Sequence, residues 1–234
     1  YNPVVFYSFG SDGQDRLYFT SERLDIYKKG KTKKKARRAE MWYSTRPSAE
    51  RSRKPLNEGW CNPACELVST TDEQFATYTR GAVTMDESRS LIIFASERSL
   101  VDGEFDGKNT SHMFDLWSTN DNFRTVTPLT RVNSDYWDSH PALASDGRIL
   151  FFTSNRPVSL AGKQDSSLNI FYSQRESDGS WSEAELVPGI NTPGDEVSPH
   201  AGADGYFYYS SNWKADSVAD HDIYRAQLTS SGLP

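Results

Sequence analysis

At 234 residues, the chain is long enough to bury one sizeable hydrophobic core as a single domain. Its 26 basic and 32 acidic residues give a formal net charge of -6, and this acidic balance argues against nucleic acid as a partner. No apolar run is long enough for a membrane-spanning helix, and the 13% aromatic content suits packed strands.

Short apolar strands separated by turn residues recur four times along the chain. In each copy a strand ends in a small polar motif, at 20–23, 95–98, 153–156 and 210–213. A third block follows, made of an acid or amide, an aliphatic residue and an aromatic residue, at 40–42, 115–117, 169–171 and 222–224. Three copies then close with an aromatic residue and a short leucine-containing strand, at Trp60 with Leu67, Phe123 with Leu129 and Trp181 with Leu186.

A unit of four short strands with this period is typical of a β-propeller blade, because one small sheet must stack against its neighbours to bury its faces. The sequence predicts an all-β propeller of four-stranded antiparallel blades, forming a single domain over 1–234 with repeats at about 1–69, 70–133, 134–191 and 192–234. Asp146-Gly147 and Asp204-Gly205 should occupy equivalent turns between the first two strands. Because an unclosed propeller exposes strand edges, we expect this chain to be part of a larger propeller or multidomain chain.

The third and fourth copies resemble the TolB-type propeller repeat of bacterial envelope proteins. The resemblance rests on residues 195–199, 204–212 and 222–224, and segments 181–186 and 190–193 are similar to the version in OmpA-family, peptidoglycan-associated proteins. It implies a periplasmic or outer-surface location, with or without a lipid anchor, and no cofactor. It also implies a non-catalytic module that binds protein partners in the envelope or assembles with them.

Propellers bind partners through the loops that connect their strands and through the mouth of the central channel. If the repeats align, seven residues near the starts of the innermost strands should cluster at this mouth: Tyr136, Trp137, Asp138, His140, Asp195, Glu196 and His200.

The acids of this set also suggest an alternative, a glycan-active propeller hydrolase that uses Asp138, Asp195 and Glu196 as an acid/base set. However, an Asp or Glu before a strand more often caps a turn by accepting backbone N–H groups. No nucleophile elbow or phosphate-binding loop is present in the sequence. We therefore predict no catalytic residues and no metal site.

The first copy carries a strongly basic loop between two predicted strands. Eight of the eleven residues at 28–38 are basic, and without them the rest of the chain would carry a charge of -14: Lys28, Lys29, Lys31, Lys33, Lys34, Lys35, Arg37 and Arg38. The loop could contact lipid head groups, peptidoglycan or an acidic partner, and would then dock the chain as an accessory subunit of a membrane complex. The alternative is a solvated hairpin loop.

Cys61 and Cys65 are the only cysteines. A structural zinc site is not expected, because the sequence has no second cysteine pair or histidine doublet. Since the resemblance implies an oxidising envelope compartment, we expect these two residues to form a local disulfide. Reduced thiols in a cytosolic protein are the alternative.

The docking hypothesis for the basic loop predicts a salt-sensitive interaction. Each exposed Lys or Arg near an anionic membrane contributes about 1 kcal/mol, and salt screens this attraction. Replacing Lys33, Lys34, Lys35, Arg37 and Arg38 with Ser should therefore abolish co-sedimentation with anionic vesicles and leave the melting temperature unchanged. Co-sedimentation that survives this change, or that does not weaken at high salt, would contradict the hypothesis.

Overall fold

The computed structural model of the chain describes residues 4–6, 14–21, 40–47, 66–67, 83–86, 91–96, 114–120, 125–160, 163–213 and 221–234. The basic loop at 28–38 and the cysteines Cys61 and Cys65 lie outside these ranges, so the docking and disulfide hypotheses remain predictions.

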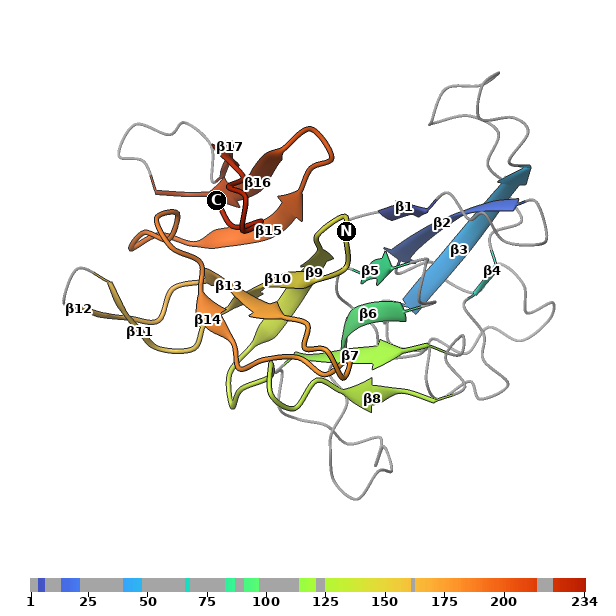
Figure 1. The fold of residues 1–234 in the computed structure, drawn as a ribbon, viewed down its shortest axis with the longest axis horizontal. Coiled ribbons are helices and arrows are strands. Elements are labelled where there is room, and N and C mark those ends of the chain that lie inside the picture. The colour runs from blue at the N-terminus through green and yellow to red at the C-terminus, as the bar shows by residue number, and fades with distance from the viewer. Residues whose placement is uncertain are drawn as a thin grey trace, which may run out of the picture.

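All regular secondary structure in the described residues is β-strand, arranged mainly in four small antiparallel sheets (Figure 1). The first sheet contains β1 (Val4–Phe6), β2 (Gln14–Ser21), β3 (Glu40–Pro47) and β4 (Glu66–Leu67), in that order. The second contains β5 (Val83–Asp86), β6 (Leu91–Ser96), β7 (Asp115–Thr119) and β8 (Thr127–Pro128). The all-β prediction is confirmed.

The third and fourth sheets continue this pattern with two differences. The third contains β9 (Asp138–Leu143), β10 (Ile149–Ser154), β13 (Asn169–Gln174) and β14 (Glu185–Leu186). A separate hairpin of β11 (Val158–Leu160) and β12 (Lys163–Asp165), which the sequence pattern did not predict, is inserted between β10 and β13. Within the described residues the fourth sheet has three strands, β15 (Glu196–Ala201), β16 (Tyr206–Ser211) and β17 (Asp222–Gln227).

The first strands of successive sheets lie side by side, as expected for the innermost strands of propeller blades. β1 contacts β5, β5 contacts β9, and β9 contacts β15. The remaining strands of each sheet follow outward in chain order, so the chain passes from the blue first sheet to the red fourth sheet across the molecule (Figure 1).

The hydrophobic core fills the spaces between neighbouring sheets, and β10 contributes to two of them. Leu150 and Phe152 pack toward the second sheet with Ile93 and Leu116, whereas Phe151 packs toward the fourth sheet with Phe207. Successive side chains of a strand point to opposite faces, so a strand buried on both faces must be apolar at every core position. This explains the continuous run Ile-Leu-Phe-Phe at the start of β10, which is buried throughout.

The two Asp-Gly turns are equivalent, which confirms the prediction made from their spacing. The N–H of Gly147 donates to the carbonyl of Ala144 at 2.9 Å, and the N–H of Gly205 donates to the carbonyl of Gly202 at 3.3 Å. Both glycines have positive φ, 66° and 85°, a conformation that side chains disfavour. In each turn the preceding aspartate also accepts a backbone N–H from the residue after the glycine.

Candidate functional site

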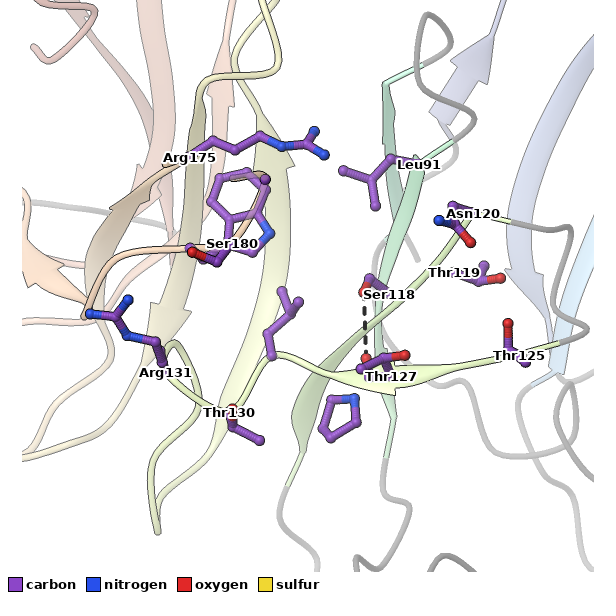
Figure 2. Close-up of a pocket in the computed structure, with 14 residues that line it drawn as sticks. Leu91, Ser118, Thr119, Asn120, Thr125, Thr127, Thr130, Arg131, Arg175 and Ser180 are labelled. Atoms are coloured by element: carbon purple, nitrogen blue, oxygen red, sulfur yellow. Dashed lines mark hydrogen bonds between the residues drawn. The ribbon is translucent and has the colours of Figure 1, made fainter. Parts of the chain in front are cut away.

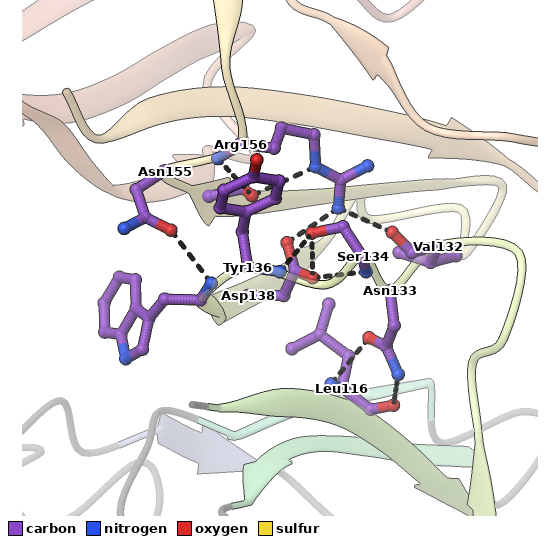
Figure 3. A network of polar contacts seen from close by, with 10 residues as sticks. Leu116, Val132, Asn133, Ser134, Tyr136, Asp138, Asn155 and Arg156 are labelled. Atoms are coloured by element: carbon purple, nitrogen blue, oxygen red, sulfur yellow. Dashed lines mark hydrogen bonds and ion pairs between the residues drawn. The ribbon is translucent and has the colours of Figure 1, made fainter. Parts of the chain in front are cut away.

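The first candidate residue, Asp138, lies buried at the start of β9, with 0% of its surface exposed. One carboxylate oxygen accepts the backbone N–H of Ser134 at 2.7 Å and the hydroxyl of Ser134 at 2.8 Å. The other forms an ion pair with Arg156 Nη2 at 2.6 Å (Figure 3). The hydrogen bonds to this carboxylate therefore come from the loop before β9, and its ion-pair partner comes from the segment just after β10.

Arg156 is held on several sides. Its Nη2 also donates to the carbonyl of Val132 at 2.7 Å, and its Nε donates to the hydroxyl of Ser154 at 3.0 Å (Figure 3). The guanidinium carbon lies 4.8 Å from the ring centroid of Phe171 and 5.3 Å from that of Phe152. The cation is thus fixed between the buried acid and the aromatic core.

Glu196 takes the equivalent position at the start of β15 and is also buried, with 0% exposed. Its carboxylate accepts the backbone N–H of Thr192 at 2.8 Å, the hydroxyl of Thr192 at 2.5 Å and the hydroxyl of Ser211 at 2.6 Å. Burial raises the pKa of Glu196 above its ordinary value, and the hydrogen bonds from Ser211 and Thr192 oppose that rise.

Backbone hydrogen bonds at both acids tie one sheet to the next. The N–H of Asp138 donates to the carbonyl of Phe114, just before β7 of the second sheet, at 2.8 Å. The N–H of Glu196 donates in the same way to the carbonyl of Leu168, just before β13, at 2.6 Å. Each arrangement consists of the buried acid, the Ser or Thr four residues before it and the backbone hydrogen bond to the preceding sheet. We call such an arrangement a junction.

The junction between the second and third sheets is also strongly acidic. Asp115, the first residue of β7, has its pKa raised to about 6 by burial and by the charges of Asp138 and Asp135. Arg156 is bound to Asp138, so it partly offsets this concentration of negative charge.

His140 lies on a β-bulge of β9 and is partly buried, with its Nδ1 atom shielded from solvent. Its φ of 49° is left-handed, and Ser198 of β15 has an equivalent φ of 55°. The Trp137 ring packs edge-on against His140, with centroids 5.4 Å apart, and also against Phe114 at 5.9 Å. Burial lowers the pKa of His140 to about 4, so this imidazole is neutral at pH 7.

His200 occupies a different place from His140. It follows the bulge of β15 opposite Tyr208 and is exposed. The two histidines therefore do not form an equivalent pair, and no group of three or more His, Cys, Asp or Glu in the described ranges could hold a metal ion.

The residues just before the two acids are fixed by a repeated asparagine. Asn155 Oδ1 accepts the backbone N–H of Trp137 at 2.9 Å, and Asn212 Oδ1 accepts that of Asp195 at 2.7 Å. The Asp195 carboxylate itself accepts the N–H of Leu168 at 2.9 Å. Trp137 and Asp195 are both partly buried, so they contribute only part of their side chains to the surface.

Two large aromatic side chains are exposed beside these residues. Tyr136 is 40% exposed and precedes β9, whereas Trp213 is 53% exposed and follows β16. The starts of β9 and β15 pair with the ends of β10 and β16, so both aromatic residues lie at the same end of their sheets. Sequence reasoning selected Tyr136 but missed Trp213, although Trp213 holds the place of Arg156 in the repeated motif.

Two clefts lie between the sheets away from the seven candidate residues. One, of about 360 Å³, lies between β7–β8 and the loop at 175–181 (Figure 2). Its lining is rich in hydroxyl side chains and includes Arg175, whose guanidinium lies 5.7 Å from the Trp181 ring centroid. The second, of about 450 Å³, lies between the third and fourth sheets near Asp146. Neither cleft contains a pair of carboxylates.

Solved structures with a similar fold include TolB proteins. A TolB from Acinetobacter baumannii aligns at 12% identity over 91% of this chain and 38% of its own, with a TM-score of 0.48. A putative TolB from Agrobacterium tumefaciens aligns at 13% identity over 92% and 58%, with a TM-score of 0.52. This chain therefore spans less than two thirds of either protein.

A structure described as a glycoside hydrolase is equally similar, at 12% identity over 96% of this chain and 69% of that one, with a TM-score of 0.53. No protein-family model matches the sequence, and no curated protein matches it. At these identities the likeness establishes the fold alone, and the chain has a TolB-like propeller fold. The described residues contain no helix long and apolar enough to cross a membrane.

The ion pair at Asp138 predicts a large loss of stability when its cation is removed. Arg156→Met should destabilise the protein by about 3 kcal/mol, because it leaves a buried carboxylate without its partner. Arg148→Met is the matched control, since Arg148 is highly exposed and lies 3.9 Å from Asp146. That change should alter stability by less than about 0.5 kcal/mol in chemical denaturation. Equal effects of the two substitutions would contradict this account.

Burial of His140 predicts a stability that falls in mild acid. The unfolded chain gains a proton near pH 6.5, whereas the folded protein resists protonation down to about pH 4. The stability due to neutral His140 is present above pH 6.5 and is lost as the pH falls toward 4, by up to about 3 kcal/mol.

The His140→Asn variant should show a smaller loss of unfolding free energy between pH 7 and pH 5 than the wild type, because asparagine tolerates the left-handed backbone and does not titrate. His200→Asn leaves the buried histidine in place and should keep the wild-type pH dependence. An unchanged profile for His140→Asn would show that burial of this side chain does not control acid stability.

Proposed function

We propose that this chain is a non-catalytic protein-binding or assembly module of the bacterial cell envelope, located in the periplasm or on the outer surface. The observation that carries the proposal is the state of Asp138 and Glu196, two of the three candidate acids. The carboxylates of Asp138 and Glu196 are buried and fully engaged in the junctions, so neither presents an oxygen to a substrate. The resemblance of the third and fourth repeats to envelope propellers supports the proposed location.

The binding surface in this proposal is the end of the sheets where β9 and β15 begin. Its exposed groups are Tyr136 and Trp213, with parts of Trp137 and Asp195, whereas the exposed His200 lies farther along β15, opposite Tyr208. Tyrosine and tryptophan combine large apolar area with a polar group and few rotatable bonds, which favours them in protein interfaces. Ser134 and Ser211, which bind the buried acids, also accept the backbone N–H groups of Tyr136 and Trp213, so the backbone that carries these two side chains is anchored before a partner binds.

Replacing Tyr136 and Trp213 together with Ser tests this surface. Cross-linking in envelope extracts should yield a discrete set of partners with the wild-type protein and with the Arg148→Ala control, whose change lies at the opposite end of the third sheet. The double variant should lose that set while keeping its melting temperature, because both side chains are exposed. The same proteins should be assayed on a panel of glycans, and hydrolysis by the wild type would overturn the proposal in favour of a propeller hydrolase.

A further inference from the structure

The aliphatic residue of the third strand is buried in the second and third sheets but exposed in the fourth. Leu116, Ile170 and Ile223 hold the same register, opposite Ala95, Thr153 and Ser210. Leu116 and Ile170 are 0% exposed, whereas Ile223 is 80% exposed.

In the second and third sheets, an asparagine clamps the backbone of this residue. Asn133 accepts the N–H of Leu116 at 2.8 Å and donates to its carbonyl at 2.9 Å. Asn191 does the same to Ile170, at 2.7 and 2.9 Å. In both sheets, one residue of the fourth strand pairs with the aromatic residue of the third strand, and this residue is Pro128 or Leu186. The asparagine lies five residues after it in each case.

The segment that contains Asn191 also covers the side chain of Ile170. Val187 donates its N–H to the carbonyl of Ile170 at 3.0 Å, and Val187 and Ile190 pack in the same core cluster as Ile170. Residues 185–191 therefore act as one unit, in which a short strand, two aliphatic side chains and a clamping asparagine cover the edge of β13.

No strand in the described part of the chain pairs with the outer edge of β17. Residues of an antiparallel strand point their N–H and C=O groups alternately to either side, and Ile223, like Ile170, points them away from the preceding strand. The outer edge of β17 thus presents the N–H and C=O of Ile223 beside its exposed side chain. These groups are equivalent to the N–H and C=O of Ile170, which Asn191 and Val187 bind on β13.

Charge at this edge favours an acidic residue in whatever pairs with it. Arg225 of β17 is equivalent in position to Tyr172 of β13. Arg225 lies opposite Tyr208, and Tyr172 lies opposite Phe151, the residue of β10 that corresponds to Tyr208. The hydroxyl of Tyr172 donates to Glu185 of β14 at 2.8 Å. Arg225 is exposed on the same face as Ile223, and its guanidinium lies 4.6 Å from the ring centroid of Tyr206 on the neighbouring strand. A glutamate placed as Glu185 is would therefore lie beside a cation that already contacts β16.

We propose that the outer edge of β17 is a strand-acceptor site for an extended segment of a partner polypeptide. That segment carries Glu-Leu followed by an aliphatic residue, with an asparagine five residues after the leucine, the pattern of residues 185–191. The added strand would pair with the backbone of β17, partly cover Ile223 and meet Arg225 with its glutamate. The argument for this edge does not depend on the aromatic surface proposed above.

The chain itself supplies the probe, a fluorescently labelled peptide of residues 181–192. Anisotropy titration with the full 234-residue protein should show saturable binding. A peptide with Asn191→Ala should bind at least tenfold more weakly, because it loses the hydrogen bonds that the asparagine makes to the edge and to its own segment. Absence of saturable binding, or equal binding of the two peptides, would overturn the proposal.

Protein variants locate the site. Ile223→Lys should abolish binding without lowering the melting temperature, since Ile223 is highly exposed. Gln174→Lys adds the same charge to exposed residue 174 of β13, whose edge is already covered, and should bind as the wild type does. Arg225→Glu should weaken binding, and a peptide with Glu185→Lys should restore it. Binding that is insensitive to Ile223→Lys would place the peptide elsewhere and refute the site.

Discussion

The structure depends on burying one carboxylate at the start of an innermost strand in each of its last two sheets. Removing a carboxylate from water costs several kcal/mol unless hydrogen bonds or a counter-charge replace the lost hydration. The loop before each strand supplies part of that replacement, because Ser134 and Thr192 stand four residues before Asp138 and Glu196 and cap them with both backbone and hydroxyl groups. The capped residue then donates its own N–H to the preceding sheet, so the same residue closes the loop and fixes the spacing of the sheets.

The two junctions satisfy the same requirement by different chemistry. The shorter Asp138 is paired with Arg156, and the Ser154 hydroxyl bonds to that arginine. The longer Glu196 accepts the equivalent hydroxyl, that of Ser211, directly. Once the acid no longer requires a cation, position 213 is free to carry a tryptophan that points to solvent. The same repeated motif therefore ends in a largely buried arginine at position 156 and in an exposed tryptophan at position 213.

Packing between sheets makes the environment of each strand depend on its neighbours. β10 lies between two other sheets, and its successive side chains enter two different core clusters. β17 carries the same sequence pattern as β13, yet Ile223 is exposed where Ile170 is buried. Exposed edges of this kind favour strand addition, which is the physical basis for the acceptor site proposed at β17.

The sequence by itself determined the all-β class, the order of the strands and the Asp-Gly turns, because these depend on side-chain alternation and on local turn chemistry within a few residues. It also selected Asp138 and Glu196, since they recur at the same place in the repeat. Only the tertiary structure decided their role: the cation for Asp138 comes from 18 residues away in the chain, and the carbonyls that hold both acids in register belong to another sheet. The packing of Trp137 between His140 and Phe114 and the exposure of Ile223 have the same origin. Solvent access depends on which sheets meet, and a local sequence pattern carries no record of that.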